Sequence, residues 1–254
     1  MKHINNKISF ILDQAAKNHK AVPQVSQLQS FSVEEAYLIQ KSSLELRYTR
    51  GEKHTGYKLG FTSRAKMEQM GLNEIIWGRL TDAMSIEQGV LDFSYFIHPR
   101  VEPEIAFLID KKIDRKITSE EVPTYLRGVA GALEIIDSRY ENFKFSLEDV
   151  IADNCSSAAY QIGTWHDATT PLDDTTIELV INDKTVQSGN ATAILGHPYQ
   201  ALSELSDILT RQGMSIEPGE IVLAGAATSA VYLELGDTAQ GVFSNLGSLE
   251  FKTT

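Results

Sequence analysis

The chain has 254 residues, of which 42% are hydrophobic, and its net charge of −11 corresponds to a pI near 5.0. This length can bury a large core, and the lack of a basic run in an acidic chain argues against nucleic acid as a partner. The lone cysteine, Cys155, excludes an intrachain disulfide framework and a cysteine-based zinc site.

The N-terminus is unlike a secretory signal, and we expect a cytoplasmic protein. Asn5, Asn6 and Lys7 interrupt the first apolar residues, and Asp13 follows the short run after them. No apolar stretch approaches the length of a membrane span, so we expect no membrane partner either.

Two helices are predicted at the N-terminus as a cover for the rest of the chain. Apolar residues recur at helical spacing from Ile4 to Ala15, which indicates an amphipathic helix. Ser32 and Glu35 have the spacing of a capping box, so a second helix should begin there and run towards Thr49.

After Gly51 the pattern changes to short β-like runs separated by turns. The predicted strands are residues 56–62, 78–82, 101–109, 130–137, 176–181, 221–224 and 249–252. Helical segments are predicted at residues 63–70, 118–128 and 198–212. Between two of the strand-like runs, Asn182 and Asp183 indicate a hairpin turn.

The order of these elements predicts the fold class. Strands and helices do not alternate regularly, so a doubly wound parallel sheet is not expected. A mixed sheet curled into a roll or barrel fits better, which makes the predicted class α+β. The expected organisation is a single catalytic domain, with a helical cover over residues 1–50 and a β-rich core over residues 51–254.

Two carboxylates are predicted to lie side by side on one strand. Side chains alternate across a strand, so Glu102 and Glu104 point to one face. Their odd-numbered neighbours point to the other face: Val101, Ile105 and Phe107. Burying two unpaired carboxylates is expensive, and a hard divalent cation with oxygen ligands removes that cost. A solvated sheet face is the alternative, because Glu-x-Glu is a common pattern.

A third acidic residue stands inside an apolar run. Glu134 lies in the middle of residues 130–137, and a glutamate in a buried strand needs a partner. A metal shared with Glu102 and Glu104 would supply that partner. A salt bridge to a lysine or arginine is the alternative, and the pattern alone does not decide between them.

Further residues could face a site, each with an ordinary alternative. Lys58 lies among apolar and small residues, where it either reaches solvent from an edge strand or faces an anionic site. Thr228 follows a strand in a turn of small residues, where backbone can approach a ligand closely. His197 precedes a predicted helix and can serve as acid, base or helix cap. Cys155 has no basic neighbour in sequence and is interpreted as a small packed residue rather than a nucleophile.

Seven segments carry a resemblance to a known family. They are GYKLGFTSRAKMEQMG from Gly56, GRLTDAM from Gly78, IHPRVEPEIAF from Ile97, ALEIIDSRYENFKF from Ala132, DVIADNCSS from Asp149, AILGHP from Ala193 and VLAGAAT from Val222. In them the chain resembles the 4-oxalocrotonate decarboxylase and 2-hydroxypentadienoate hydratase family of the fumarylacetoacetate-hydrolase superfamily. The resemblance extends from about Phe31 to Phe251.

The resemblance implies a mixed β-roll with a helical cover and a Mg²⁺ or Mn²⁺ site. The family's three metal ligands, its active-site lysine, its aspartate and its carboxylate-binding turn all fall on matching residue types. The metal ligands fall on Glu102, Glu104 and Glu134. The active-site lysine falls on Lys58, the aspartate on Asp82 and the carboxylate-binding turn on Thr228. The departures are Cys155, which replaces a usual alanine, and the divergent region before Phe31.

The stretches TSRAKMEQMG, DSRYENFKF and LGHP resemble the decarboxylases more than the hydratases. The implied reaction is metal-dependent decarboxylation of 2-oxo-3-hexenedioate (4-oxalocrotonate) to 2-hydroxypenta-2,4-dienoate in aromatic catabolism. The first alternative is hydration of 2-hydroxypenta-2,4-dienoate, which uses the same chelate. The others are an acylpyruvate hydrolase and a non-catalytic partner subunit. The resemblance also implies a homo-oligomer that can associate with a related hydratase or decarboxylase.

The implied chemistry predicts the character of the pocket. The three glutamates should converge on one point, and the Lys58 ammonium should face the same cavity. The pocket for the departing carboxylate should be largely apolar, because apolar groups favour neutral CO₂ over the anion. A weak contact from Arg64 or Arg139 is expected to orient that carboxylate, and His197 is included among the substrate-binding residues.

Overall fold

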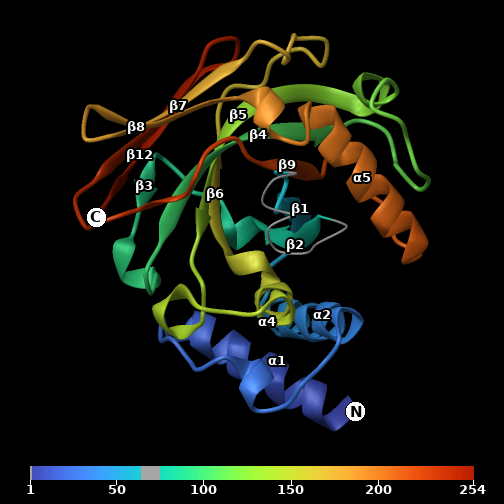
Figure 1. Cartoon of the computed structure of the whole chain (residues 1–254), viewed down its shortest axis with the longest axis vertical. Coiled ribbons are helices and arrows are strands. Elements are labelled where there is room, and N and C mark those ends of the chain that lie inside the picture. The colour runs from blue at the N-terminus through green and yellow to red at the C-terminus, as the bar shows by residue number, and fades with distance from the viewer. Residues whose placement is uncertain (1, 64–74) are drawn as a thin grey trace.

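The structure is a computed structural model that describes residues 2–63 and 75–254 (Figure 1). The helix predicted over residues 63–70 therefore falls, apart from Ser63, outside the described residues, and so does Arg64. The helices of the described part are α1 (Lys2–Lys17), α2 (Val33–Thr49), α4 (Leu147–Ala152) and α5 (Pro198–Arg211). None of these helices is both long and apolar enough to cross a membrane.

The strands form two sheets (Figure 1). The larger sheet contains, in spatial order, β2 (Ile76–Thr81), β1 (His54–Gly60), β9 (Ile221–Ala226), β4 (Arg100–Ile109), β5 (Leu126–Ile136) and β6 (Ser157–Ile162), with β10 (Val231–Tyr232) paired to β4. The smaller sheet contains β3 (Val90–Leu91), β12 (Gly247–Thr253), β11 (Thr238–Phe243), β7 (Thr176–Ile181) and β8 (Lys184–Asn190). Neighbours are antiparallel except β1 with β9 and β12 with β3. The predicted mixed sheet of an α+β fold is confirmed.

The main core lies between the two sheets. Leu133 and Ile135 of β5 belong to the same buried cluster as Phe243 of β11 and Phe251 of β12. Glycine is required at position 131, because a Cβ on Gly131 would lie 2.5 Å from the Phe243 ring. This core covers the face of β5 that carries the odd-numbered residues. The even-numbered side chains of β5 therefore point to the opposite face of the sheet.

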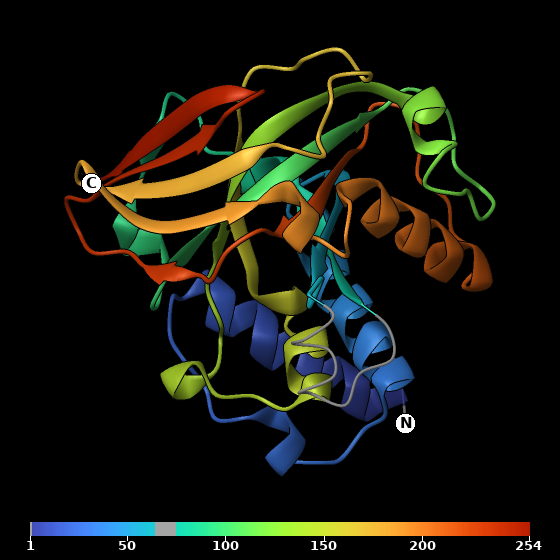
Figure 2. The ribbon, with the colours of Figure 1, turned by 45° about the horizontal axis from the view of Figure 1, so that its top comes forward.

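Helices α1, α2 and α4 lie together beside the larger sheet (Figure 2), and a second apolar cluster joins them to β2. Ile39 of α2, Ile76 of β2 and Ile151 of α4 are buried in it. Gln40 joins the same three elements, because its amide nitrogen donates to the carbonyl oxygens of Trp77 and Ile151 at 3.1 and 3.0 Å. The cover thus includes α4 as well as α1 and α2, and the division of the chain at residue 50 stays a prediction.

Local signals in the sequence predict several element boundaries correctly. Glu35 N–H donates to Ser32 Oγ and Ser32 N–H donates to the Glu35 carboxylate, which is the predicted capping box of α2. Asn182 and Asp183 form the predicted hairpin turn between β7 and β8, with positive φ angles that suit these residue types. Helix α5 ends at Arg211, one residue before its predicted end.

The helix predicted over residues 118–128 is wrong. The chain there forms a short 3-10 turn over Val122–Tyr125, and β5 begins at Leu126. Pro123 lies inside the turn, and the apolar residues after it are buried in the sheet. Tertiary burial therefore overrides the helix-like polar start of this segment. The sequence also does not predict β6 or β11.

Candidate metal centre and substrate cavity

Three carboxylates meet on one face of the β4–β5 strand pair. Glu102 and Glu104 are two residues apart on β4, so their side chains share a face. Glu134 on β5 stands directly opposite Glu102 in the antiparallel register. One carboxylate oxygen from each residue lies within 4.8 Å of the other two. The predicted convergence is confirmed, whereas the role of these side chains as metal ligands stays a prediction.

This cluster crowds acidic groups into a buried place. Glu104 and Glu134 are both 0% exposed, and burial together with the Glu134 carboxylate raises the pKa of Glu104 well above its usual range. The Gly225 N–H donates to Glu104 Oε2 at 2.8 Å, while Glu104 Oε1 is buried without a hydrogen-bond partner in the described part of the chain. An orphaned carboxylate oxygen is costly, and three carboxylates in one place suit a hard divalent cation such as Mg²⁺.

Lys58 on β1 is a buried ammonium beside this cluster. It is 3% exposed, and its Nζ lies 2.8 Å from Glu134 Oε2 and donates to the Cys155 carbonyl oxygen at 3.4 Å. Burial alone would lower the pKa of Lys58, but the neighbouring carboxylates outweigh burial and raise it. Lys58 therefore faces the glutamates as predicted, and it does not reach solvent from an edge strand. One ammonium leaves the cluster of three carboxylates with a negative balance.

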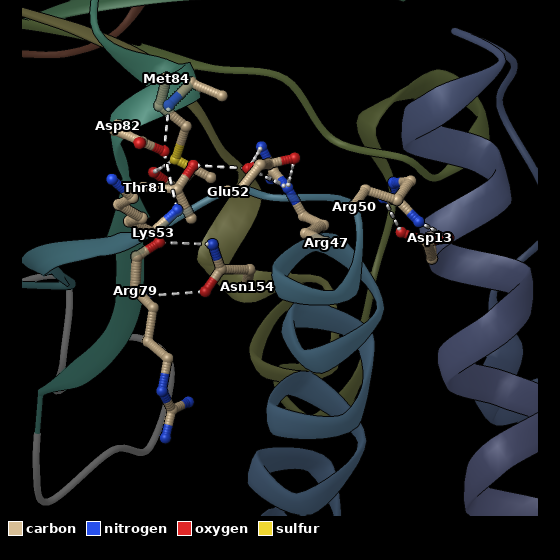
Figure 3. Close-up of polar contacts among 12 residues, drawn as sticks. Asp13, Arg47, Arg50, Glu52, Lys53, Arg79, Thr81, Asp82, Met84 and Asn154 are labelled. Atoms are coloured by element: carbon tan, nitrogen blue, oxygen red, sulfur yellow. Dashed lines mark hydrogen bonds and ion pairs between the residues drawn. The ribbon is translucent and has the colours of Figure 1, made fainter.

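A left-handed turn supports Lys58. Asn154, Cys155 and Ser156 have φ angles of 51°, 52° and 58°, a conformation that is uncommon for residues other than glycine. The Asn154 side chain holds this turn against β2, since it accepts from the Arg79 N–H at 2.8 Å and donates to the Arg79 carbonyl at 2.9 Å (Figure 3). A Cβ on Gly78 would lie 2.6 Å from the Asn154 carbonyl oxygen, so glycine permits this approach. Backbone strain of this kind is concentrated at functional sites.

A cavity of about 140 Å³ adjoins the cluster. Glu102, Lys58 and Ser156 are among its polar lining residues. Its apolar lining includes Phe61, Ile76, Ile136, Phe143, Phe145 and Val150. Such a lining suits a small molecule with an anionic head and a hydrocarbon body. The cavity is therefore largely apolar, and its use as the pocket of the departing carboxylate stays a prediction.

Asp82 and Thr228 lie outside this arrangement. Asp82 is exposed, and its Oδ1 accepts from the N–H groups of Lys53 and Ala83 at 2.8 and 2.9 Å; the contact with Lys53 is drawn in Figure 3. Thr228 follows β9 and donates to the Ser229 carbonyl at 3.4 Å. Neither residue lines the cavity or belongs to the carboxylate cluster. The structure does not bring them to the glutamates, and their assigned roles stay predictions.

Arg139 is a buried residue held by protein partners, and its contact with substrate stays a prediction. Its Nε donates to Asp153 Oδ1 at 2.5 Å, and its Nη2 donates to the Asp153 carbonyl. Its Nη1 donates to the carbonyl oxygens of Asp137 and Ser157 at 2.5 and 3.2 Å. All three guanidinium nitrogens are therefore engaged with the protein. A buried arginine needs such partners, which the sequence alone does not reveal.

His197 is the N-cap of α5. Its Nδ1 accepts from the Tyr199 N–H at 3.0 Å, and its Nε2 lies 3.3 Å from Asp173 Oδ1. Burial lowers the pKa of His197, although Asp173 opposes this shift. The alternative of a helix cap is confirmed, and the ring does not line the cavity. Arg64 lies outside the described residues, so its substrate contact stays a prediction.

Sequence reasoning misses several residues at the site. Phe143 and Phe145 follow β5 and line the cavity, and Ser156 lines it from the turn before β6. Ser157 Oγ donates to Glu134 Oε1 at 3.0 Å. Single aromatic residues in a polar stretch carry no periodic signal. The run Asn-Cys-Ser-Ser before β6 is visible as a group of small polar residues, and this is the only signal that could have indicated the turn.

The chain is similar to known proteins over nearly its whole length. The family model for the Fumarylacetoacetate (FAA) hydrolase C-terminal matches residues 59–253. A 4-oxalocrotonate decarboxylase of Pseudomonas sp is 44% identical over 250 residues, which make up 98% of this chain and 98% of the relative. A 2-hydroxyhexa-2,4-dienoate hydratase of Comamonas testosteroni is 32% identical over 88% of this chain and 87% of the relative.

A solved structure is also closely similar. The 4-oxalocrotonate decarboxylase from Pseudomonas putida G7, complexed with magnesium and adipate, has a TM-score of 0.95 and 30% sequence identity to this chain. The likeness covers 100% of this chain and 98% of that chain. The curled mixed sheet with its helical cover is thus the fold of fumarylacetoacetate-hydrolase enzymes. The chain belongs to the fumarylacetoacetate hydrolase family, as the sequence predicts.

Proposed function

We propose that this chain is a metal-dependent lyase that decarboxylates 2-oxo-3-hexenedioate (4-oxalocrotonate) to 2-hydroxypenta-2,4-dienoate in aromatic catabolism. The observation that carries the proposal is the cluster of Glu102, Glu104 and Glu134 beside a small, largely apolar cavity. Similarity to 4-oxalocrotonate decarboxylases over nearly the whole chain supports the choice of substrate.

The three glutamates would hold Mg²⁺, with Mn²⁺ as the alternative ion. Glu104 Oε1, which is buried without a hydrogen-bond partner among the described residues, is an atom that a cation would satisfy. Bound Mg²⁺ supplies a Lewis acid for the carboxylate and 2-oxo oxygens of the substrate. The magnesium complex of the Pseudomonas putida G7 decarboxylase supports this choice of ion.

Lys58 would stabilise the charge that moves during the reaction. The bond to the far carboxylate breaks, its electron pair moves through the adjacent alkene towards the 2-oxo oxygen, and CO₂ leaves. The 2-oxygen then takes one proton from water to give the 2-hydroxy product. The Lys58 ammonium lies 2.8 Å from Glu134, so it keeps a positive charge close to the head of the substrate. Lys58 would act as an electrostatic partner of the substrate, because its ammonium pairs with Glu134 beside the cavity.

The apolar lining would favour loss of CO₂. Phe61, Phe143 and Phe145 remove water from the far carboxylate, and this disfavours the anion relative to neutral CO₂. No arginine is found among the described residues that line the cavity. The far carboxylate would therefore lack an arginine ion pair from these residues. Such a pair would stabilise the ground state and slow the reaction.

Product analysis tests the proposal. Purified protein given Mg²⁺ and 2-oxo-3-hexenedioate should release CO₂ and accumulate 2-hydroxypenta-2,4-dienoate. Glu104→Gln is the matched control, because it keeps the shape of the side chain and removes its charge. If the wild-type protein ignores the diacid but hydrates the dienoate to 4-hydroxy-2-oxopentanoate, it is a hydratase. Similarity to the Comamonas testosteroni hydratase makes this the second candidate.

The assembly and location belong to the same proposal. We expect a cytoplasmic homo-oligomer that can also associate with a related hydratase. Phe10 of α1 and Leu38 of α2 are large apolar side chains exposed on the helical cover, and burial between subunits would stabilise them. Light scattering of the purified protein, alone and mixed with such a hydratase, measures both associations. A monomer in both samples would contradict this part of the proposal.

A further inference from the structure

The hydroxyl of Ser156 is a buried polar group at the candidate cavity. Ser156 is 2% exposed and lines the cavity. Its Oγ has no hydrogen-bond partner among the residues that the structure describes. Leaving a buried hydroxyl unpaired is costly, and such exceptions in folded proteins require a reason. A ligand in the cavity would supply the missing partner.

The backbone at Ser156 is fixed on both sides. Its N–H donates to the Asp153 carbonyl at 3.0 Å, and its carbonyl accepts from the Asp137 N–H at 2.8 Å. In an extended strand, consecutive side chains would point to opposite faces. The left-handed φ of Ser156 interrupts this alternation, so Ser156 lines the cavity while Ser157 also reaches the site.

The residues on either side of Ser156 contact the charged groups. The preceding carbonyl, that of Cys155, accepts from Lys58 Nζ at 3.4 Å. The following side chain, that of Ser157, donates to Glu134 Oε1 at 3.0 Å. Ser156 stands between these two contacts in the chain. Ser156 itself lines the same cavity as Lys58 and Glu102, the groups beside which the head of an anionic ligand would lie.

We propose that Ser156 Oγ donates a hydrogen bond to an oxygen of the 2-oxo acid head of the substrate. This inference rests on the proposed function for the substrate and adds a further contact beside the glutamates and Lys58. A hydroxyl can rotate towards a carboxylate or oxo oxygen and pair with it without adding charge to the site. The bond strengthens as negative charge builds on the 2-oxo oxygen, which makes Ser156 a catalytic residue.

The test uses the full chain and two probes. Turnover is followed with 2-oxo-3-hexenedioate, and binding is measured by calorimetry with oxalate, a non-reactive dianion that offers a similar pair of chelating oxygens. Ser156→Ala should lower kcat and weaken oxalate binding in Mg²⁺ by about tenfold each, the usual effect of losing a charge-assisted hydrogen bond. Binding of Mg²⁺ alone should not change. The Tm should not fall, because Ser156 Oγ has no partner among the described residues.

Ser206 on α5 provides a matched control. It is also buried, but its Oγ accepts from the Ile117 N–H at 3.0 Å and donates to the Ser203 carbonyl at 2.7 Å. Ser206→Ala should lower Tm by about 2–4 °C and leave kcat and oxalate binding unchanged. Ser156→Gly is a second variant at the site, since glycine adopts a φ of 58° without steric cost. It should lose activity as Ser156→Ala does, without losing stability.

The outcomes separate this inference from the proposed function. Wild-type kcat and oxalate affinity in Ser156→Ala would overturn the inference. An equal fall in Mg²⁺ affinity would overturn it as well, because the hydroxyl would then serve the metal. If the wild-type protein forms no CO₂, yet Ser156→Ala weakens its Mg²⁺-dependent binding of oxalate, the proposed decarboxylation fails and the Ser156 contact stands. If the wild-type protein does not bind oxalate in Mg²⁺, the inference fails whatever the reaction.

Discussion

Two parts of the site, the β4–β5 strand pair and the turn before β6, position polar groups by opposite means. The strand pair is regular, and its register places Glu134 opposite Glu102. The turn is left-handed at three successive residues, from Asn154 to Ser156. The regular backbone therefore collects charges that repel one another, whereas the strained backbone places neutral groups and the carbonyl that receives Lys58.

The two parts also differ in what stabilises them. Repulsion within the strand pair is relieved in part by Lys58, and a divalent cation would relieve the rest. Strain in the turn is offset by the two hydrogen bonds between Asn154 and the Arg79 backbone. This difference predicts that the stability of the strand pair depends on its charges and on bound metal. The stability of the turn should depend on the Asn154 side chain. The following variants test that comparison.

Glu104→Gln should have the largest effect. With Mg²⁺, turnover should fall by more than about 100-fold, because the loss of a direct ligand exceeds the usual effect of losing a ligand's outer partner. In EDTA the variant should be more stable than the wild-type protein, since a buried charge beside Glu134 is removed. Steady-state kinetics and thermal unfolding measure the two effects. If Glu104→Gln is less stable than the wild-type protein in EDTA, repulsion between Glu104 and Glu134 does not destabilise the protein.

Glu104 should also make the stability of the protein depend on pH. Because the pKa of Glu104 is raised in the folded state, the folded protein binds a proton there more tightly than the unfolded chain does. The Glu104 contribution should therefore lower wild-type stability in EDTA as pH rises above the unfolded value of 4.5. Glu104→Gln lacks that contribution, so the difference in Tm between the two proteins should widen with pH. If the difference in Tm between the two proteins is the same from pH 4 to pH 8, Glu104 does not make the stability depend on pH in this way.

Lys58→Met should have the next largest effect. Turnover should fall by about 10- to 100-fold, because a positive charge near the developing anion is lost. In EDTA the free energy of unfolding should fall by about 3 kcal/mol, since Glu134 is left as an uncompensated buried charge. Urea denaturation measures this loss, and Mg²⁺ should restore part of it. Lys252→Met, at an exposed position on β12, is the control and should change neither quantity.

Asn154→Ala should have a smaller effect on turnover and a clear effect on stability. Loss of the two bonds to Arg79 should lower the free energy of unfolding by about 2 kcal/mol and turnover several-fold, as the turn relaxes. Asn182→Ala is the matched control, because Asn182 also has a positive φ and bonds Asp237 and Thr238. It should lose stability only. Equal turnover in both variants would remove the turn from the mechanism.

Phe145→Asn should have the smallest effect. A polar amide at the cavity wall would stabilise the departing carboxylate and slow its loss, so we expect kcat to fall by about threefold with little change in stability. Phe145→Leu keeps the wall apolar and should retain turnover. Steady-state kinetics with 2-oxo-3-hexenedioate compares them. An increase in kcat for Phe145→Asn would show that desolvation does not assist the reaction.

The sequence by itself determines the elements of the strand pair. Alternation along β4 assigns Glu102 and Glu104 to one face, and Glu134 stands out as the charged residue of an apolar run. The cap of α2 and the β7–β8 hairpin are also visible, because their residues interact within a few positions of one another. Each of these features depends on local periodicity or local hydrogen bonding, which a sequence records directly.

Only the tertiary structure decides the rest of the site. The register that sets Glu134 opposite Glu102 depends on the packing of two sheets, and Lys58 meets the Cys155 carbonyl from 97 residues away. Arg139 shows the same limit, because sequence spacing does not identify its buried hydrogen-bond partners. The left-handed turn at Ser156 is stabilised by contacts of the Asn154 side chain with β2, a partner that the sequence does not identify. Contacts between distant segments fix such conformations, and no local pattern encodes them.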